Sequence, residues 1–200
     1  MAKARIFVDY WNFQLNIIKF YGSGFRIDWK KVSPWLMSQL EAMVKTDIEY
    51  EGTSVYASFD KSKYSDCNLI NWIDSFLRKL PGYEVSLVER KPKNPPICPH
   101  CHTEITFCPE CNKPMTATIE KGVDTAIVTD LISLAWENSW EYAILITSDK
   151  DFIPAVDMLN RKGFHVINAY FPPVGSELVK HCWANIPLNS SLTEIEYSKT

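Results

Sequence analysis

Two groups of side chains in this chain have the types and spacing of metal-binding sites: aspartates that follow apolar strands, and cysteines in C-x-x-C pairs. Asp9 directly follows the apolar run 6–8, and Asp149 closely follows the apolar run 143–146. A carboxylate just past a buried strand lies at the edge of a sheet, where a crevice can form. Because neighbouring carboxylates repel, a divalent cation is the usual reason to gather them. These positions predict an acidic, metal-dependent site.

Four of the six cysteines form two C-x-x-C pairs separated by six residues: Cys98, Cys101, Cys108 and Cys111. Two thiolate pairs of this kind are typical of a closed, structural Zn²⁺ site, since four thiolates leave no open coordination position. Iron in a rubredoxin-like site is the rival, but nothing in the chain suggests a use for a redox centre. His100 and His102 are expected to be bystanders. The spacing predicts a zinc-ribbon-like finger.

The composition is that of a soluble globular protein. The 200 residues suggest one domain with a small insertion, and 46% hydrophobic with 22% charged residues is enough for a real core. The net charge of -3 neither indicates nor excludes nucleic-acid binding. The chain has no membrane-length apolar run and does not begin like a signal peptide, so we expect a cytoplasmic protein with no membrane partner.

Strand and helix patterns alternate along the chain. We expect strands at 4–8, 53–59, 83–88, 142–147 and 164–169, and helices at 13–20, 34–44, 69–80, 123–135, 152–159 and 176–183. This alternation favours a three-layer α/β/α fold with a mainly parallel central sheet. The stretch 90–118 has neither periodicity and is expected to be an insertion within a domain spanning 1–188, followed by a tail at 189–200. No internal repeat is apparent.

Four short motifs resemble the NYN domain family, relatives of PIN-domain and FLAP-type nucleases: FVDYWN at 7–12, KGVD at 121–124, TSDKDF at 147–152 and KGFHV at 162–166. The resemblance covers nearly the whole chain except the insertion. It implies a PIN-like fold and a metal-dependent ribonuclease site in which Mg²⁺ or Mn²⁺ is held by Asp9, Asp124, Asp149 and Asp151. Asn12 matches the family asparagine after the first aspartate. The chain departs from the family at Trp183 and Ala184, near which many members carry an aspartate.

The role of each acidic residue is a hypothesis. Asp9 and Asp149 would anchor the cations and Asp124 would complete the cage. Asp151 would bind through water or orient the attacking water, and Asn12 would donate to the phosphate or fix Asp9. Any one aspartate alone is more simply a turn residue or helix cap.

Two related alternatives are less well supported by the residues. Asp130 also matches a family position, but it lies six residues past Asp124, well round the helix, and is not expected to share the cation. A haloacid-dehalogenase-type phosphatase needs an aspartate where Trp11 stands.

The expected function is endonucleolytic hydrolysis of RNA. The alternatives are a non-catalytic RNA-binding or regulatory protein, or a protein-interaction module acting through the finger. Candidate substrate contacts are Lys61, Lys63, Arg90, Lys91, Lys93, Lys121 and Ser148. Tyr10 and Trp11 are placed to stack an unpaired base, although core packing is favoured for Trp11. Expected partners are RNA, single-stranded DNA, and a second copy or another protein bound through the finger.

Overall fold

A six-stranded, fully parallel sheet forms the centre of the computed structural model, which describes residues 1–115 and 117–198. Residues 116 and 199–200, which fall in the predicted insertion and tail, lie outside the described residues. The strand order is β3-β2-β1-β6-β7-β8. The strands are β1 (Ala2–Asp9), β2 (Ile48–Phe59), β3 (Tyr83–Glu89), β6 (Tyr142–Ile146), β7 (His165–Tyr170) and β8 (Ala184–Pro187). The chain moves outward from β1 to β3 and then crosses to β6, so the strand order reverses between β1 and β6.

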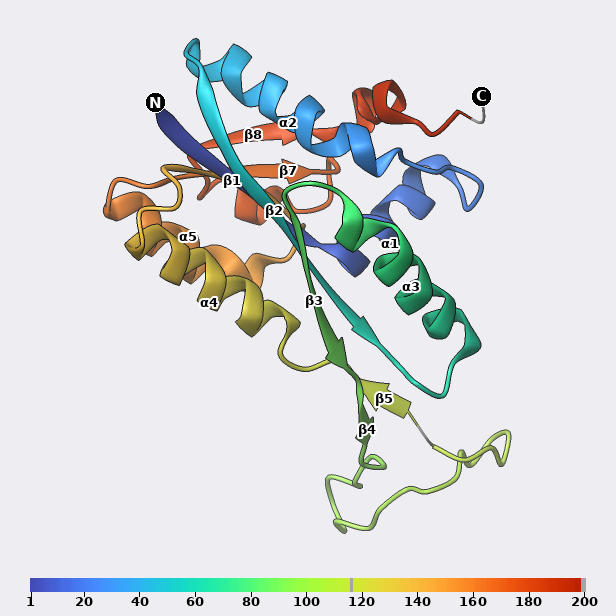
Figure 1. The fold of residues 1–200 in the computed structure, drawn as a ribbon. Helices are drawn as coiled ribbons and strands as arrows, with labels where there is room; N and C mark the ends of the chain where they lie inside the picture. Colours follow the sequence, from blue (N-terminus) through green and yellow to red (C-terminus); the bar gives the residue numbers. More distant parts are fainter. Residues whose placement is uncertain (116, 199–200) are drawn as a thin grey trace.

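Helices cover both faces of the sheet (Figure 1). Along β1, Ile6 and Val8 point into one hydrophobic cluster and Phe7 into the other, because successive side chains of a strand alternate. The first face carries α1 (Tyr10–Tyr21), α2 (Trp29–Val44) and α3 (Tyr64–Ser75), and the second carries α4 (Val123–Trp136), α5 (Ile153–Arg161) and the short α6 (Ser176–Val179). The predicted three-layer α/β/α fold is confirmed. None of the described helices has the length and apolar character needed to cross a bilayer.

Some element boundaries differ from the sequence-based expectation. Helix α2 begins at Trp29, where the Asp28 carboxylate accepts from the Lys30 amide, so Pro34 lies inside the helix and not at its start. The helix expected at 176–183 ends at Val179, and the short strand β8 follows it. The described residues also contain four 3-10 segments: Leu77–Lys79, Lys150–Phe152, Leu188–Ser190 and Leu192–Ile195. The last two bury apolar side chains in the first cluster.

The insertion forms a projecting arm, defined here as residues 90–119, that leaves from the end of β3 (Figure 1). Its base is a two-stranded antiparallel ladder of β4 (Lys91–Lys93) and β5 (Ala117–Ile119). Beyond the described part of this ladder lie two hairpins, 96–105 and 106–115, whose backbone hydrogen bonds match at an offset of ten positions. In the first hairpin the amides of residues 98, 102 and 105 donate to the carbonyls of residues 103, 98 and 96. In the second the amides of residues 108, 112 and 115 donate to the carbonyls of residues 113, 108 and 106. His102 and Asn112 share a left-handed backbone, with φ of 57° and 52°. The arm therefore contains a tandem structural repeat, which corrects the expectation of no internal repeat. The sequence carries its signal, because Cys-Pro-x-Cys recurs ten positions apart at 98–101 and 108–111.

Candidate metal centre

Asp9 ends β1 beside the point where the strand order reverses, and it caps the N-terminus of α1. Its Oδ1 accepts from the Asn12 amide at 3.2 Å and its Oδ2 accepts from the Thr147 hydroxyl at 3.2 Å. The residue is only 7% exposed. Burial, with repulsion from Asp124 and Glu120, raises the pKa of Asp9 to about 6, although its two hydrogen bonds oppose the shift. This carboxylate carries its negative charge only against a substantial penalty.

Asp149 and Asp151 follow β6, on the neighbouring strand of the sheet. The Oδ1 of Asp149 accepts from the Asp151 amide at 2.9 Å, which caps the 3-10 turn Lys150–Phe152. Capping thus explains one oxygen of Asp149 and leaves the other unexplained. Among the described residues, Asp149 Oδ2 and the carboxylate of Asp151 accept no hydrogen bond. These oxygens are available to an external ligand.

Asp124 brings the third segment of chain to this edge. It lies in the first turn of α4, after Gly122, whose φ of 101° turns the chain into the helix. Partial burial raises the pKa of Asp124, and repulsion from Asp149, Glu120 and Asp151 adds to the shift. The structure therefore places Asp9, Asp149 and Asp151 each within electrostatic reach of Asp124. In the described chain, however, no three acidic, histidine or cysteine side chains are close enough to hold a metal ion as they stand.

Asn12 and Ser148 connect the acidic residues to an adjacent cleft. Asn12 Oδ1 accepts from the Ser148 amide at 2.9 Å and from Asn16 Nδ2 at 3.1 Å, while the backbone of Asn12 fixes Asp9. The cleft has a volume of 480 Å³ and is lined by Asn12, residues 148–150 and residues 174–177. Gly175 has φ of 83°, and a Cβ there would lie 3.0 Å from Ser148 Cα. This close approach positions Ser148 against the cleft wall.

Glu120 is a fifth carboxylate of the site, and the sequence-based assignment does not include it. It raises the pKa of both Asp9 and Asp124, so it lies within electrostatic reach of both. The Ser58 hydroxyl donates to Glu120, and Arg90 Nη2 lies 3.7 Å from the Glu120 carboxylate. Its position just before the KGVD motif is the signal that would have indicated it.

The base of the arm is fixed beside the acidic residues, and the predicted basic contacts surround it. Arg90 Nε donates to Ser58 Oγ at 2.9 Å, and its guanidinium lies over the Trp11 ring, 5.3 Å from the ring centroid. On the other side, Lys61 pairs with Glu89 at 2.6 Å. The remaining predicted lysines are exposed: Lys63, Lys91, Lys93 and Lys121. Ser148 lies apart from them, in the cleft.

Two residues set aside from the cation site are explained by packing. Asp130 Oδ2 accepts from the buried Tyr56 hydroxyl at 2.7 Å, which ties α4 to β2. Trp11 is half-buried, as expected for core packing, and its Nε1 donates to the Ser58 carbonyl at 2.6 Å.

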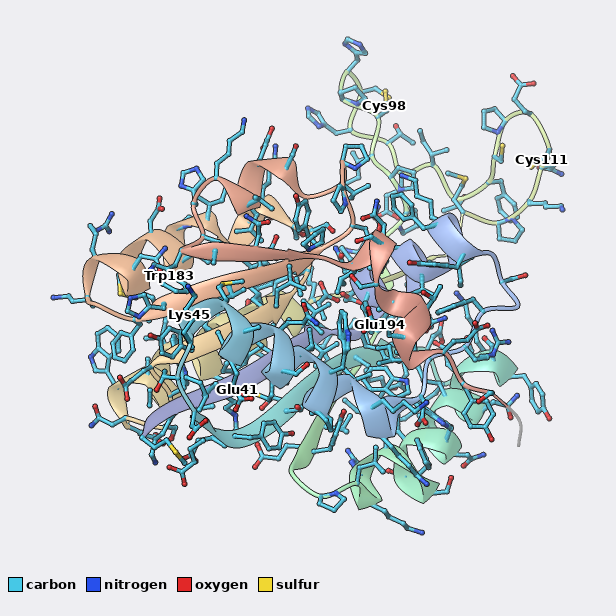
Figure 2. The ribbon with its side chains drawn as sticks, turned by 90° about the horizontal axis from the view of Figure 1, so that it is seen from above. Glu41, Lys45, Cys98, Cys111, Trp183 and Glu194 are labelled. Carbon is cyan, nitrogen blue, oxygen red and sulfur yellow. The ribbon has the colours of Figure 1, made fainter. Side chains whose placement is uncertain are left out.

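The four cysteines of the arm are paired within each hairpin and not between hairpins. Hydrogen bonding to Thr103 is the main cause of the lowered pKa of Cys101, and its neighbour Cys98 adds to the shift. Backbone contacts are the main cause of the lowered pKa of Cys108, and its neighbour Cys111 adds to that shift. Figure 2 shows Cys98 and Cys111 on separate loops of the arm, and no group of three metal-binding side chains occurs within the described residues. The zinc site therefore stays a prediction.

Comparisons with known proteins agree with this architecture. The model of the NYN domain matches residues 3–189. A crystal structure of a protein of unknown function from Vibrio parahaemolyticus RIMD 2210633 has a similar fold, with a TM-score of 0.56 at 18% identity, covering 98% of this chain and 96% of that chain. No curated protein matches the chain. Because the family model spans nearly the whole chain, this protein belongs to the NYN domain family, whose domains are generally ribonuclease-like nuclease domains.

Proposed function

We propose that the protein is a metal-dependent endoribonuclease that hydrolyses phosphodiester bonds of RNA at the acidic edge of its sheet. The observation that carries the proposal is the gathering of Asp9, Asp124 and Asp149, from three distant segments, around the point where the strand order reverses. Their mutual repulsion and the raised pKa of Asp9 disfavour the folded state unless a cation compensates. Membership of a nuclease-like family supports the same chemistry.

The donor set fits Mg²⁺ or Mn²⁺, which prefer oxygen ligands and keep several waters. Asp9, Asp124, Asp149 and Asp151 would hold the cation, directly or through water. When bound, it would activate water and stabilise the leaving oxygen.

The other groups at this edge serve the substrate. Asn12 Oδ1 is engaged by the Ser148 amide, which leaves its Nδ2 to donate to a phosphate oxygen. Arg90 and the exposed lysines at the base of the arm would bind the RNA backbone.

Purified protein incubated with RNA and with single-stranded DNA, in Mn²⁺, Mg²⁺ or chelator, tests the proposal. Cleavage of RNA that requires the metal and is lost by at least about 100-fold in Asp149→Asn is expected. Asp47→Asn provides the matched control, because Asp47 is exposed before the N-terminal end of β2 and touches none of the site. Equal cleavage by Asp149→Asn and parent would refute the assignment. RNA binding without metal-dependent turnover would instead establish a non-catalytic RNA-binding protein.

We further propose that the arm binds one Zn²⁺ through Cys98, Cys101, Cys108 and Cys111. Each hairpin presents two adjacent thiols, and zinc would draw the two equivalent hairpins together. Elemental analysis of protein purified without added metal is expected to give one zinc per chain, and Cys101→Ser should lose it while Cys67→Ser keeps it. Zinc-free parent protein would contradict the proposal.

The arm offers a surface for RNA, for a second copy of the chain or for another protein. Deleting residues 94–115, which keeps Arg90 and Thr118 and their contacts with the sheet, distinguishes these roles. Weaker RNA cleavage would assign the arm to the substrate, whereas unchanged cleavage would assign it to a protein partner or a homodimer, which sedimentation of the full chain would detect.

A further inference from the structure

A large groove separates α1 from α3 on the first face of the sheet, where Figure 1 shows these two helices side by side. Its volume is 870 Å³, within the range of pockets that hold sizeable organic ligands. Seven aromatic side chains line it: Tyr10, Trp11, Phe25, Trp29, Trp72, Phe76 and Tyr197. A cluster of aromatic rings at an open surface is unusual unless that surface binds a ligand or a partner.

The rings form a connected row. Ring centroids are 5.3 Å apart for Tyr10 and Trp11, 6.2 Å for Tyr10 and Trp29, and 5.9 Å for Trp29 and Trp72. Tyr10 and Trp29 are buried, so they fix the positions of their half-buried neighbours. At the open side, Tyr197 is 54% exposed although its amide is held by the Arg26 carbonyl at 2.8 Å. The groove thus offers rigid rings whose positions are set before any ligand binds.

Polar groups along the groove match the edges of nucleobases. Gln14 and Asn68 line it, and among the described residues neither side chain makes a hydrogen bond. Primary amides pair with base edges because they present a donor and an acceptor side by side. Arg26 also lines the groove, with Nη1 donating to the carbonyls of Ser23 and Phe25 and its other nitrogens left for a ligand.

Trp11 links the groove to the region of the acidic residues. It lines the groove and lies two residues past Asp9, with the Arg90 guanidinium over its ring. Lys63, at the N-cap position of α3, brings a further cation close to the groove wall at Ser65. An RNA strand that crosses the carboxylates would therefore meet the Arg90 cation first, and then the row of aromatic rings and the side-chain amides of Gln14 and Asn68.

We propose that this groove binds the unpaired bases of single-stranded RNA next to the cleavage site. The inference rests on the proposed function, since it identifies single-stranded RNA as the substrate class of the same site. Bases in a duplex are stacked on one another and cannot reach the rings, whereas unpaired bases stack on aromatic side chains.

Binding of a fluorescent single-stranded oligonucleotide to the full chain in chelator tests the inference without any turnover. Asn68→Glu places a carboxylate in the groove and should weaken binding by about tenfold, and Tyr197→Ala should weaken it by about fivefold or more through the loss of one stacking ring. Asn71→Glu makes the same change on an exposed position of α3 outside the lining and should leave Kd within about twofold. A blunt RNA duplex should bind at least about tenfold more weakly than the single strand.

The outcomes separate the two proposals. Groove-dependent binding without metal-dependent cleavage would leave this inference intact and overturn the proposed function. Metal-dependent cleavage with parent-like binding by both Asn68→Glu and Tyr197→Ala would overturn the groove alone. RNA binding could also be unchanged by these substitutions while a peptide binds the protein without displacing RNA. That result would assign the groove to a protein partner and would also refute the inference.

Discussion

Neutralising Asp9 should stabilise the metal-free protein at the expense of its activity. The pKa of Asp9 rises from 3.8 to about 6 on folding, chiefly through burial. Since one pKa unit corresponds to about 1.4 kcal/mol, the ionised carboxylate destabilises the fold by about 3 kcal/mol at neutral pH. Asparagine keeps the acceptor for the Asn12 amide but disturbs the hydrogen bond with the Thr147 hydroxyl, which offsets part of the gain. We expect Asp9→Asn to be more stable by about 1 to 3 kcal/mol.

The stability difference between Asp9→Asn and the parent should depend on pH. Because the pKa of Asp9 is higher in the folded state, its contribution to stability is fully present below about pH 4, is lost as the pH rises through about 6, and then stays constant. The advantage of Asp9→Asn should therefore appear at about pH 8 and vanish at about pH 4.

Urea unfolding in chelator at both pH values measures the difference, and Asp47→Asn serves as an exposed control that should not change. Adding Mn²⁺ should stabilise the parent far more than Asp9→Asn, since the variant lacks a ligand. A variant that is equally stable or less stable than the parent at about pH 8, with a native circular dichroism spectrum, would refute the electrostatic reasoning.

Other substitutions separate the geometry of the site from general stability. Gly175→Ala should lower the free energy of unfolding by about 2 to 4 kcal/mol and slow cleavage, because its Cβ would meet the Ser148 backbone at 3.0 Å. Gly163→Ala, with φ of 90° and open space around its Cβ, should lower it by only about 1 kcal/mol and cleave normally. Urea unfolding and cleavage rates check both. Thr53→Val should lower the free energy of unfolding by about 1 to 3 kcal/mol without affecting cleavage, since it removes a buried hydroxyl bonded to two others far from the site. Glu120→Gln should lower the pKa of the two aspartates that Glu120 repels, which carboxyl NMR titration in chelator would show as a shift toward lower pH.

The parts of the site that lie at strand ends could be predicted from sequence. The apolar runs before Asp9 and Asp149 are unambiguous, and parallel strands bring their carboxyl ends to one edge. Asp124 opens the helix predicted at 123–135, and the structure places it within electrostatic reach of Asp9, Asp149 and Asp151. Local periodicity and strand topology together account for these positions.

Features that depend on packing between distant segments could not be predicted. Glu120 reaches the acidic residues because the contacts of Arg90 with Ser58 and of Thr118 with Asp60 hold the base of the arm against the sheet. The aromatic groove depends on how α1 and α3 sit relative to each other, which no local pattern specifies. Pro34 suggested a helix start, but burial of Trp29 and its neighbours extends α2 in front of it.

The tandem hairpins make the length of the arm adjustable. Among the described residues, the backbone hydrogen bonds of hairpin 96–105 stay within that hairpin, and those of hairpin 106–115 stay within theirs. The β4–β5 ladder closes the base of the arm independently. A unit gained or lost would change how far the arm extends without altering its anchoring at Arg90 and Thr118. Because doubling a loop costs only about 0.6 kcal/mol in closure entropy, the fold would tolerate such changes. Relatives that differ in the number of units could thus engage substrates or partners of different size while keeping one catalytic core.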